Sequence, residues 1–265
     1  MKLHAVAAPS RATLSRWARA LPGRRALVWG DFVLDEYVRC LSRRVSREAP
    51  VLILDWQARS VQPGGAANAA LNLASLGARV SVVGLVGADP AGRELRELLE
   101  RARIDTTGLV EHPNAETVVK TRVVAGAVHT ALQQVLRIDR GGRFAARSSA
   151  VVRSLAAALE SAGGSAEAVV LSDYGYGSVT PERAAPWIAR WRDAGATVAV
   201  DSRHAVMRYS GVTLATPNES EASEAADLEI ASGRDLERVA ARLIARMRVE
   251  HLIVTRGRDG LTLWN

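Results

Sequence analysis

The sequence predicts an α/β fold, namely a three-layer α/β/α sandwich with a mostly parallel central sheet and a small β lid. Short apolar runs alternate with helical segments over most of the chain. Strands that alternate with helices favour a parallel sheet that is covered on both faces. Two longer segments, 49–61 and 116–139, are rich in β-branched residues and lack helix signals. They interrupt the alternation, which indicates a separate small sheet.

The elements of the main domain follow in order along the chain. Apolar runs such as ALVWG and VSVVGLVG predict strands at 26–30, 80–87, 168–172, 197–201, 211–216 and 251–255. Apolar residues at helical spacing predict helices at 66–76, 91–102, about 149–160, 181–193, 219–226 and 234–247. Residues 1–23 predict an N-terminal amphipathic helical extension, and residues 24–265 form the expected main domain.

The lid is expected from about 37–62 and 113–139. Its two long segments flank the first strand–helix–strand unit, and we expect them to pair with each other. This arrangement places a lid over the carboxyl ends of the main strands, where open α/β sheets bind ligands. The turn DRGGRF at 139–144 is the expected hinge back to the main domain.

Composition excludes several classes of protein. The formal net charge is +7, but arginines are interspersed with acids along helices, as in GRELRELLERAR, so we expect no nucleic-acid partner. No apolar run approaches the roughly 20 residues that span a bilayer, so we expect a cytoplasmic protein without a membrane partner. Cys40 is the only cysteine, which excludes disulfides within the chain, and the five histidines show no metal-ligand spacing.

The stretch PGGAANAALNLASLG, residues 63–77, lacks large side chains at the point where a helix begins. Two interpretations are open. The glycines allow a tight turn and close packing of the helix on the sheet, which also explains the alanines. Alternatively, they let a ligand approach the backbone, with Asn68 as the amide that holds it. The first N–H groups of the helix then favour an anion or a hydroxyl-rich ligand.

Acidic or amide side chains follow several of the predicted strands. They are Asp31 and Asp35 in the predicted loop GDFVLDEY, Asp173 in SDYGYG, Asp201 in DSRH, and Asn218 and Glu221 in TPNESE. Carboxylates at such an edge suit sugar hydroxyls, from which they accept hydrogen bonds. Each residue also has an interpretation as a turn or capping residue, and Asn218 with Glu221 has the spacing of a capping box.

The chain resembles the ribokinase-like (PfkB) carbohydrate kinase family over about residues 24–264. The family's first signature is matched by the spacing of Gly64, Gly65, Ala66, Asn68, Ala70, Gly77 and Gly87. Within the family the chain is most similar to kinases that act on heptose 7-phosphate. The segments that carry this similarity are GDFVLDEY, SREAPV, VGLVGADPAG, TVVKTR with QVLRID, SDYGYG and TPNESE.

The resemblance implies ATP-dependent phosphorylation of a sugar or sugar phosphate, with the anomeric hydroxyl of heptose 7-phosphate as the expected acceptor. The residues that it implies for sugar binding are Asp35, Gly64, Gly65 and Asn68, with Asp173 as a further hydroxyl partner. The cations that suit a phosphate on the substrate are Lys120, Arg122 and Arg137. The residues implied on the nucleotide side are Asn218, Thr255 and Gly257. Glu221 is expected to organise Mg²⁺ through water, so ATP and Mg²⁺ are the expected cofactors.

Three features depart from the family's pattern. Tyr176 stands where the heptose kinases usually have a lysine, and Ser202 stands where they usually have a proline after Asp201. The family's second signature, a Gly-Ala-Gly-Asp turn that provides the anion hole and the catalytic aspartate, does not occur in the sequence. We therefore expect no catalytic base in this chain and place that aspartate beyond Asn265. A truncated kinase is favoured over a degenerate relative.

Other functions stay open at this point. The chain could be a kinase for another sugar or nucleoside, or a sugar-binding protein without catalysis. A Rossmann dehydrogenase is disfavoured because GGAANAA lacks the Gly-x-Gly-x-x-Gly spacing. A homodimer through the lid is also expected, since an exposed sheet tends to pair with a second copy.

Overall fold

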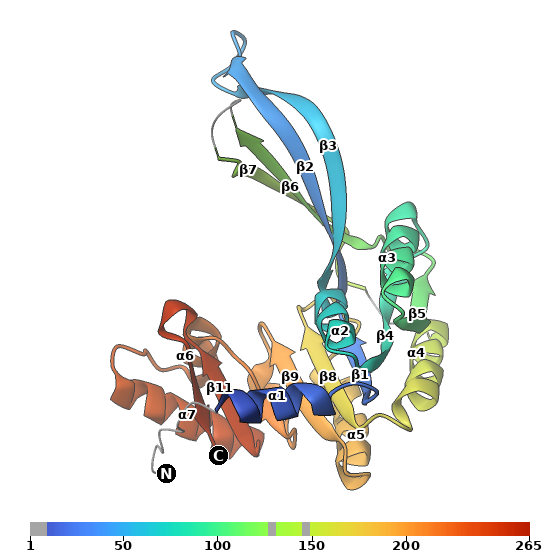
Figure 1. Cartoon of the computed structure of the whole chain (residues 1–265), viewed down its shortest axis with the longest axis vertical. Helices are drawn as coiled ribbons and strands as arrows, with labels where there is room; N and C mark the ends of the chain where they lie inside the picture. Colours follow the sequence, from blue (N-terminus) through green and yellow to red (C-terminus); the bar gives the residue numbers. More distant parts are fainter. Residues whose placement is uncertain (1–9, 127–130, 145–148) are drawn as a thin grey trace.

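The computed structural model describes residues 10–126, 131–144 and 149–265. Its main sheet has eight strands in the order β12-β11-β10-β9-β8-β1-β4-β5, and a second sheet has four strands in the order β3-β2-β6-β7 (Figure 1). All neighbours in the main sheet are parallel except β11 and β12. We call the second sheet the lid, and Figure 1 shows it projecting away from the main sheet.

The strands and helices have the following bounds. The main sheet contains β1 (Arg25–Gly30), β4 (Arg79–Gly87), β5 (Asp105–His112), β8 (Ala168–Asp173), β9 (Thr197–Ser202), β10 (Leu214–Ala215), β11 (His251–Thr255) and β12 (Leu261–Trp264). The lid contains β2 (Phe32–Val45), β3 (Leu52–Gly65), β6 (Val118–Gly126) and β7 (Gln133–Arg140). The helices are α1 (Arg11–Ala20), α2 (Ala66–Ser75), α3 (Pro90–Arg101), α4 (Ser149–Gly163), α5 (Pro181–Asp193), α6 (Glu219–Ala226) and α7 (Gly233–Met247). Two short 3₁₀ helices, η1 (Val206–Arg208) and η2 (Gly257–Asp259), complete the set.

Two hydrophobic layers hold the main sheet between its helices. Successive residues of a strand point to opposite faces, so Leu27 and Trp29 of β1 join one layer and Val28 joins the other. The first layer receives side chains from α4, α5, α6 and α7, and the second receives side chains from α2 and α3. Burial on both faces explains why the parallel strands read as nearly continuous apolar runs. The predicted α/β sandwich with a mostly parallel sheet is thereby confirmed.

The structure corrects three details of the predicted elements. Residues 32–37, read as part of the loop GDFVLDEY that carries Asp35, belong to the lid strand β2. The two long lid segments do not pair with each other, because β2 lies between β3 and β6. The strand predicted at 211–216 is reduced to β10, while β5 and β12 were not predicted.

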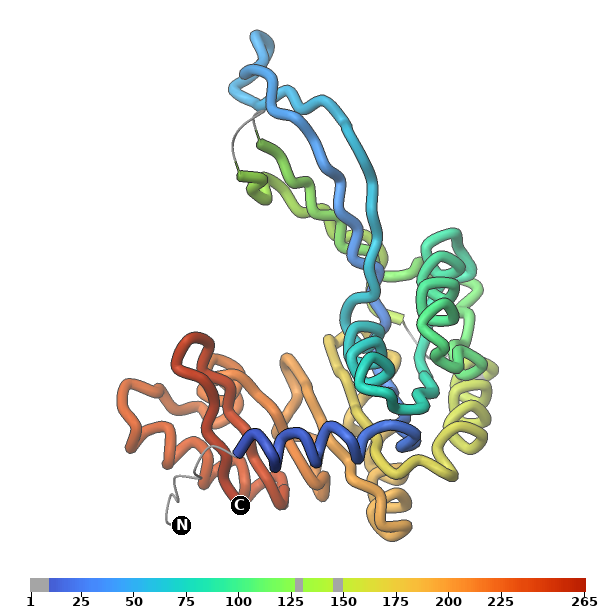
Figure 2. Tube along the Cα trace, in the orientation of Figure 1, coloured from blue at the N-terminus to red at the C-terminus, as the bar shows by residue number. Residues whose placement is uncertain are grey.

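The N-terminal part and the lid contain positions that cannot be compared with the prediction. Residues 1–9 of the expected extension and 127–130 of the expected lid segment lie outside the described residues. Within the described part, α1 has no buried residue, and its Leu14 and Trp17 are exposed. No helix among residues 10–126, 131–144 and 149–265 is long and apolar enough to cross a membrane. The Cα trace in Figure 2 shows that β2 and β3 run directly from the main domain into the lid.

Candidate sugar and nucleotide site

Asp31 joins the carboxyl ends of two neighbouring strands, β1 and β8. Its side chain is fully buried and accepts hydrogen bonds from the backbone N–H groups of Tyr174, Tyr176 and Ser178, each at 2.9 Å. Burial nevertheless raises the pKa of Asp31 above its ordinary value, and the nearby charge of Asp173 adds to this rise. Asp31 therefore holds the SDYGYG turn against the end of β1, which is a structural role.

Gly64 and Gly65 precede α2, and at each of them a different close contact leaves no room for a side chain. A Cβ on Gly64 would lie 2.5 Å from Oδ2 of Asp35, and a Cβ on Gly65 would lie 2.6 Å from the carbonyl oxygen of Asp31. Gly65 also adopts a φ of 57°, which favours glycine. The glycines thus make room for the carboxylate of Asp35 and for a tight turn, which supports the first interpretation, while the approach of a ligand to this backbone stays a prediction. Asn68, one turn into α2, is exposed.

The predicted lid residues meet on one side of the lid sheet, which we call the front face. The register places Asp35 beside Lys120, and Arg122 between Tyr37 and Arg137. Arg122 donates from Nη1 to Oδ1 of Asp35 at 2.6 Å, and Asp35 with Arg122 forms an ion pair that is mostly shielded from water. Arg137 is exposed and pairs with Asp139 at 2.8 Å.

Lys120 connects the front face of the lid to the SDYGYG turn. Its side chain is buried, and its Nζ lies 5.8 Å from the ring centroid of Tyr174 and 5.6 Å from that of Tyr176. Arg203, which follows β9, lies 5.5 Å from the ring of Tyr174 on the main-domain side. Positively charged groups from the lid and the main domain therefore gather around these two rings. Tyr176, the departure from the family's lysine, has a defined role here as a partner of Lys120.

Asp173 is already engaged by the protein. Its carboxylate accepts hydrogen bonds from the backbone N–H of Gly175, from the Ser202 hydroxyl and from the Tyr209 hydroxyl, all at 2.9 Å. Burial and the adjacent Asp173 charge raise the pKa of Tyr209, so this hydroxyl stays protonated and donates. Ser202, the second departure from the family, thus ties β9 to the end of β8. A direct contact of Asp173 with a sugar hydroxyl stays a prediction.

Asn218 and Glu221 form the capping box that their spacing suggested. The Asn218 backbone N–H donates to Oε2 of Glu221, and the Glu221 backbone N–H donates to Oδ1 of Asn218, both at 2.9 Å. This geometry fixes the carboxylate of Glu221 at the start of α6, at the strand ends. A cap and a site for Mg²⁺-bound waters are compatible, since a carboxylate accepts more than one hydrogen bond.

Asp201 was predicted to follow a strand but was assigned no role of its own. Burial and then the charge of Glu221 raise the pKa of Asp201 to about 6, against the opposing charge of Arg203. Asp201 and Glu221 therefore make a pair of carboxylates whose mutual repulsion a cation would relieve. This donor chemistry fits Mg²⁺ with a nucleotide. The signal was present in the sequence, because Asp201 ends an apolar strand as Asp173 does.

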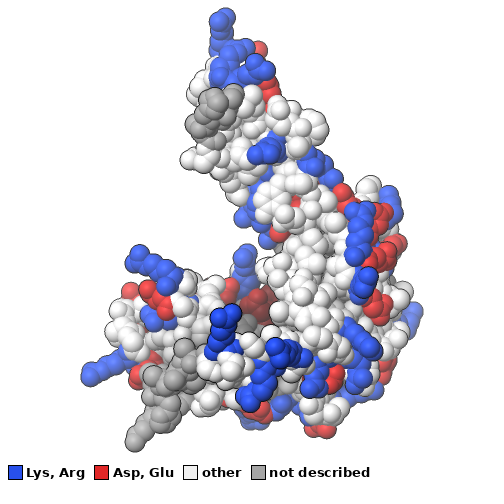
Figure 3. Space-filling view, in the orientation of Figure 1, with Lys and Arg blue, Asp and Glu red and all other residues white. Residues whose placement is uncertain are grey.

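Thr255 lies next to Asn218, and Gly257 follows two residues later in the same turn. Asn218 and Thr255 form an isolated parallel bridge, with the Thr255 N–H donating to the carbonyl of Pro217 at 3.0 Å. Gly257 has a φ of 56°, and a Cβ there would meet no atom within 4 Å. The space above this turn is therefore open. Figure 3 shows the concave side of the molecule below the lid, with acidic atoms at its base.

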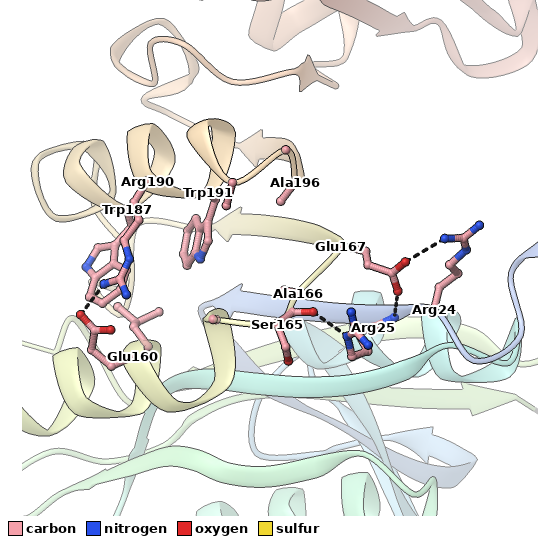
Figure 4. Close-up of a pocket in the computed structure, with 15 residues that line it drawn as sticks. Arg24, Arg25, Glu160, Ser165, Ala166, Glu167, Trp187, Arg190, Trp191 and Ala196 are labelled. Atoms are coloured by element: carbon pink, nitrogen blue, oxygen red, sulfur yellow. Dashed lines mark hydrogen bonds and ion pairs between the residues drawn. The ribbon is translucent and has the colours of Figure 1, made fainter.

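A second hollow lies at the opposite, amino-terminal edge of the strands and has a different character. It is a cavity of about 670 Å³ between α4 and α5 (Figure 4). Its charged side chains are paired, since Arg24 meets Glu167 and Arg190 meets Glu160. Figure 4 shows these pairs on either side of the cavity. None of the predicted site residues reaches it, so the carboxyl edge is the candidate site.

The chain is similar to known proteins in both sequence and fold. The chain is 38% identical over 242 residues to the bifunctional protein HldE of Gluconobacter oxydans (strain 621H), a match that covers 91% of this chain and 49% of HldE. The chain spans about half the length of the curated relatives it matches. Phosphofructokinase-2 from Escherichia coli in complex with fructose-6-phosphate matches the fold with a TM-score of 0.70 at 20% identity, covering 92% of this chain and 77% of that one.

A second solved structure and a family model point the same way. The structure of Arabidopsis thaliana ribokinase complexed with ribose and ATP has a TM-score of 0.63 at 18% identity, and the match covers 91% of this chain and 75% of that one. The model of the pfkB family carbohydrate kinases matches residues 28–264, which is nearly the whole chain. The chain therefore belongs to the pfkB family of carbohydrate kinases.

Proposed function

We propose that this chain is the kinase part of an enzyme that transfers the terminal phosphoryl group of ATP to the anomeric hydroxyl of heptose 7-phosphate. The observation that carries the proposal is the front face of the lid, where Arg122 holds the carboxylate of Asp35 beside the space left by Gly64. A carboxylate in this setting selects a ligand that offers hydroxyl donors. The similarity to the heptose 7-phosphate kinases supplies the choice of sugar.

Different residues on and beside the lid contact the hydroxyls and the phosphate of such a substrate. Asp35 accepts hydrogen bonds from sugar hydroxyls, and Asn68 offers an exposed amide from the first turn of α2. Lys120 and Arg122 face the same region and suit the phosphate that the sugar brings. Arg137, paired with Asp139 at the rim, is available to a phosphate that displaces Asp139. Holding the sugar at both ends orients one hydroxyl for in-line attack.

ATP and Mg²⁺ fit the other side of the site. Asn218, Thr255 and Gly257 offer backbone and side-chain polar groups around an open turn. Bound Mg²⁺ supplies charge neutralisation for the phosphate groups. Asp201 and Glu221 hold its water ligands, and they orient the phosphates by doing so. No residue of this chain is assigned as the base for the hydroxyl proton.

Calorimetric titration of the chain with heptose 7-phosphate, fructose 6-phosphate, ribose and adenosine tests the proposal. We expect heptose 7-phosphate to bind at least tenfold more tightly than ribose, because only the phosphorylated sugar uses the lid cations. Release of ADP from ATP in the presence of each compound is measured in parallel, and the chain by itself is expected to turn over slowly. Preferential binding of adenosine or ribose, or no sugar phosphate binding at all, contradicts the proposed substrate.

We further propose that two copies associate through their lids. Trp56, Leu136 and Ile138 on the lid are 65%, 53% and 46% exposed, which is unusual for large apolar side chains on a sheet. A second copy would bury them. Light scattering behind size-exclusion chromatography is expected to show a dimer for the wild type and a monomer for Trp56→Glu.

A further inference from the structure

The side of the lid that faces away from Asp35, which we call the back face, contains a buried carboxylate. Glu36 follows Asp35 on β2 and is only 7% exposed. It accepts a hydrogen bond from the Thr121 hydroxyl of β6 and forms ion pairs with Arg59 of β3 and Arg140 of β7. One carboxylate from β2 thus contacts a side chain from each of the other three lid strands.

Arg59 extends this network from the lid to the main domain. Its Nη1 and Nη2 donate to the two carboxylate oxygens of Glu94 at 3.0 and 2.7 Å. Glu94 lies on α3, which packs on the main sheet. A two-point guanidinium–carboxylate pair fixes orientation as well as distance. The chain of contacts from Glu36 through Arg59 to Glu94 therefore defines how the lid stands relative to α3.

A second connection starts from Asp89, the N-cap of the same helix. Its Oδ1 accepts from the Gly92 N–H and from the Thr117 hydroxyl, both at 2.7 Å, and its Oδ2 accepts from the Thr117 N–H at 2.8 Å. Thr117 immediately precedes β6, so Asp89 fastens the root of a lid strand to the start of α3. The Thr117 hydroxyl also accepts from the N–H of Gly87 at 2.9 Å.

The glycines of the GADPAG segment permit this close approach. A Cβ on Gly87 would lie 2.6 Å from the backbone nitrogen of Thr117, and a Cβ on Gly92 would lie 2.8 Å from the Thr117 hydroxyl oxygen. Either side chain would push the lid root away from α3. The GADPAG segment carries part of the family resemblance but had no predicted role. Its backbone is shaped to receive Thr117.

Apolar packing and polar contacts both join the lid to α3, since Leu34 and Val119 at the lid root are buried in the same hydrophobic cluster as Leu95 of α3. A cavity of about 490 Å³ separates the back face from the first turns of α3, and the residues that line it include Glu36, Arg59, Asp89, Glu94, Thr117 and Arg140. Apolar packing across a cavity is weak because the lining atoms lack partners. Beyond this buried root, the ion pairs and hydrogen bonds therefore help to set the angle of the lid over the site.

We propose that Asp89, Glu94, Arg59 and Glu36 form a lid mount that positions Asp35 and Arg122 for the sugar, so that Glu36 and Asp89 are positioning residues for substrate binding. The identity of the ligand in this inference rests on the proposed function, whereas the contacts that orient the lid do not. Asp35 and Glu36 are adjacent on β2, and a rotation of the lid about α3 moves both together. Loosening the mount therefore weakens sugar binding without touching the sugar or the nucleotide.

Glu94→Gln is the principal test, because Glu94 is partly exposed and its replacement leaves the core intact. Glu97→Gln is the matched control, since Glu97 lies on the same helix and pairs only with Arg101 of that helix. Asp89→Asn and Glu36→Gln test the other two connections. Three quantities are measured for each variant: hydrogen exchange of β2, β3 and β6, the Kd for heptose 7-phosphate, and the Kd for Mg·ATP.

We expect Glu94→Gln to speed exchange in β2 and β3 and to raise the Kd for heptose 7-phosphate about two- to fivefold, as the loss of a half-exposed ion pair allows. Exchange in β8 and the Kd for Mg·ATP stay at wild-type values, and Glu97→Gln changes none of these. If hydrogen exchange of the lid strands is unchanged in both Glu94→Gln and Glu36→Gln, the proposal that these residues hold the lid in place is wrong. Faster lid exchange with unchanged sugar affinity overturns the positioning role. If the wild type binds no sugar phosphate, the proposed function fails, and the exchange data still decide whether the mount exists.

Discussion

The lid mount and the strand ends below it both contain shielded carboxylates, but the pKa values of the two groups are shifted in opposite directions. In the mount, burial acts to raise the pKa of Glu36, yet hydrogen bonds from Thr121 and Arg59 outweigh it and hold the pKa below its ordinary value. Asp89 likewise has a lowered pKa, because hydrogen bonds from Thr117 and Gly92 outweigh burial. At the strand ends, burial raises the pKa of Asp31 and of Asp201.

The mount acids and Asp31 are satisfied by donors inside the chain, whereas Asp201 is left charged at a cost. Each mount carboxylate meets a guanidinium group or several N–H and O–H donors inside the chain. Asp201 instead faces the charge of Glu221, with Arg203 as the opposing cation. A group held in an unfavourable charge state next to a second carboxylate is suited to a ligand that brings positive charge. The mount therefore serves the structure, as Asp31 does, and we propose that Asp201 serves the ligand.

Asp35 and Glu36 are neighbours on β2 that face opposite sides of the lid, so they offer the sharpest test of this comparison. We expect Asp35→Ala to raise the Kd for heptose 7-phosphate about 10- to 100-fold, as the loss of charged hydrogen bonds to hydroxyls implies. Hydrogen exchange of β6 and the Kd for Mg·ATP should stay unchanged. Asp55→Ala, which removes another arginine-paired lid aspartate, is the control. A wild-type Kd for Asp35→Ala would remove the front face from the sugar site.

Asp201→Asn tests the strand ends and should have two effects of opposite sign. The raised pKa of Asp201 means that its charge costs folding free energy above about pH 6. Removing that charge should raise the urea midpoint at pH 8, while the Kd for Mg·ATP rises about fivefold, because one of two carboxylates near the cation is lost. Asp193→Asn, an exposed acid on α5, is the control. A lowered urea midpoint would mean that the Asp201 charge is compensated within the chain.

The main sheet could be predicted from the sequence because its signals are local. Strands such as 168–172 and helices such as 181–193 are defined by short apolar runs and by capping residues, and both agree with the structure within a few residues. The lid strand β2 could not be predicted in this way. Asp35 and Glu36 put charges on both of its faces, and their partners Arg122 and Arg59 lie 87 and 23 residues away in sequence.

The roles of the acids at the strand ends show a similar limit. Sequence position identified Asp31, Asp173 and Glu221 as candidates, but it could not tell a structural acid from one that faces a ligand. Asp31 is satisfied by N–H groups more than 140 residues away, at Tyr174, Tyr176 and Ser178. Only Glu221, whose capping partner Asn218 is three residues away, had a local signal that predicted its contact. The lid mount was missed because Asp89 meets Thr117, and Glu36 meets Arg59, only after the lid has formed.

The pH dependence of the free energy of unfolding should also distinguish the two groups of acids. Its expected effect is the smallest of those predicted. Asp201 has a folded-state pKa of about 6 against an ordinary value of 3.8, so its protonation stabilises the folded chain at low pH, and that stability is lost as pH rises through about 6. The mount acids have lowered pKa values, so their contribution is present above the ordinary carboxyl range and is lost only as pH falls below it.

We therefore expect the free energy of unfolding to increase on the order of 1 kcal/mol between pH 8 and pH 5, a figure reduced for the partial exposure of Asp201. Urea titrations at four pH values measure it, and Asp201→Asn should flatten the profile. Lid exchange, corrected for the intrinsic effect of pH on amide exchange, should stay constant over the same range. Faster lid exchange already at pH 6 would mean that the mount carboxylates are not held in their charged state. That result would contradict the lowered pKa values of the mount carboxylates, and with them the contrast between the two regions, even if Asp201 behaved as expected.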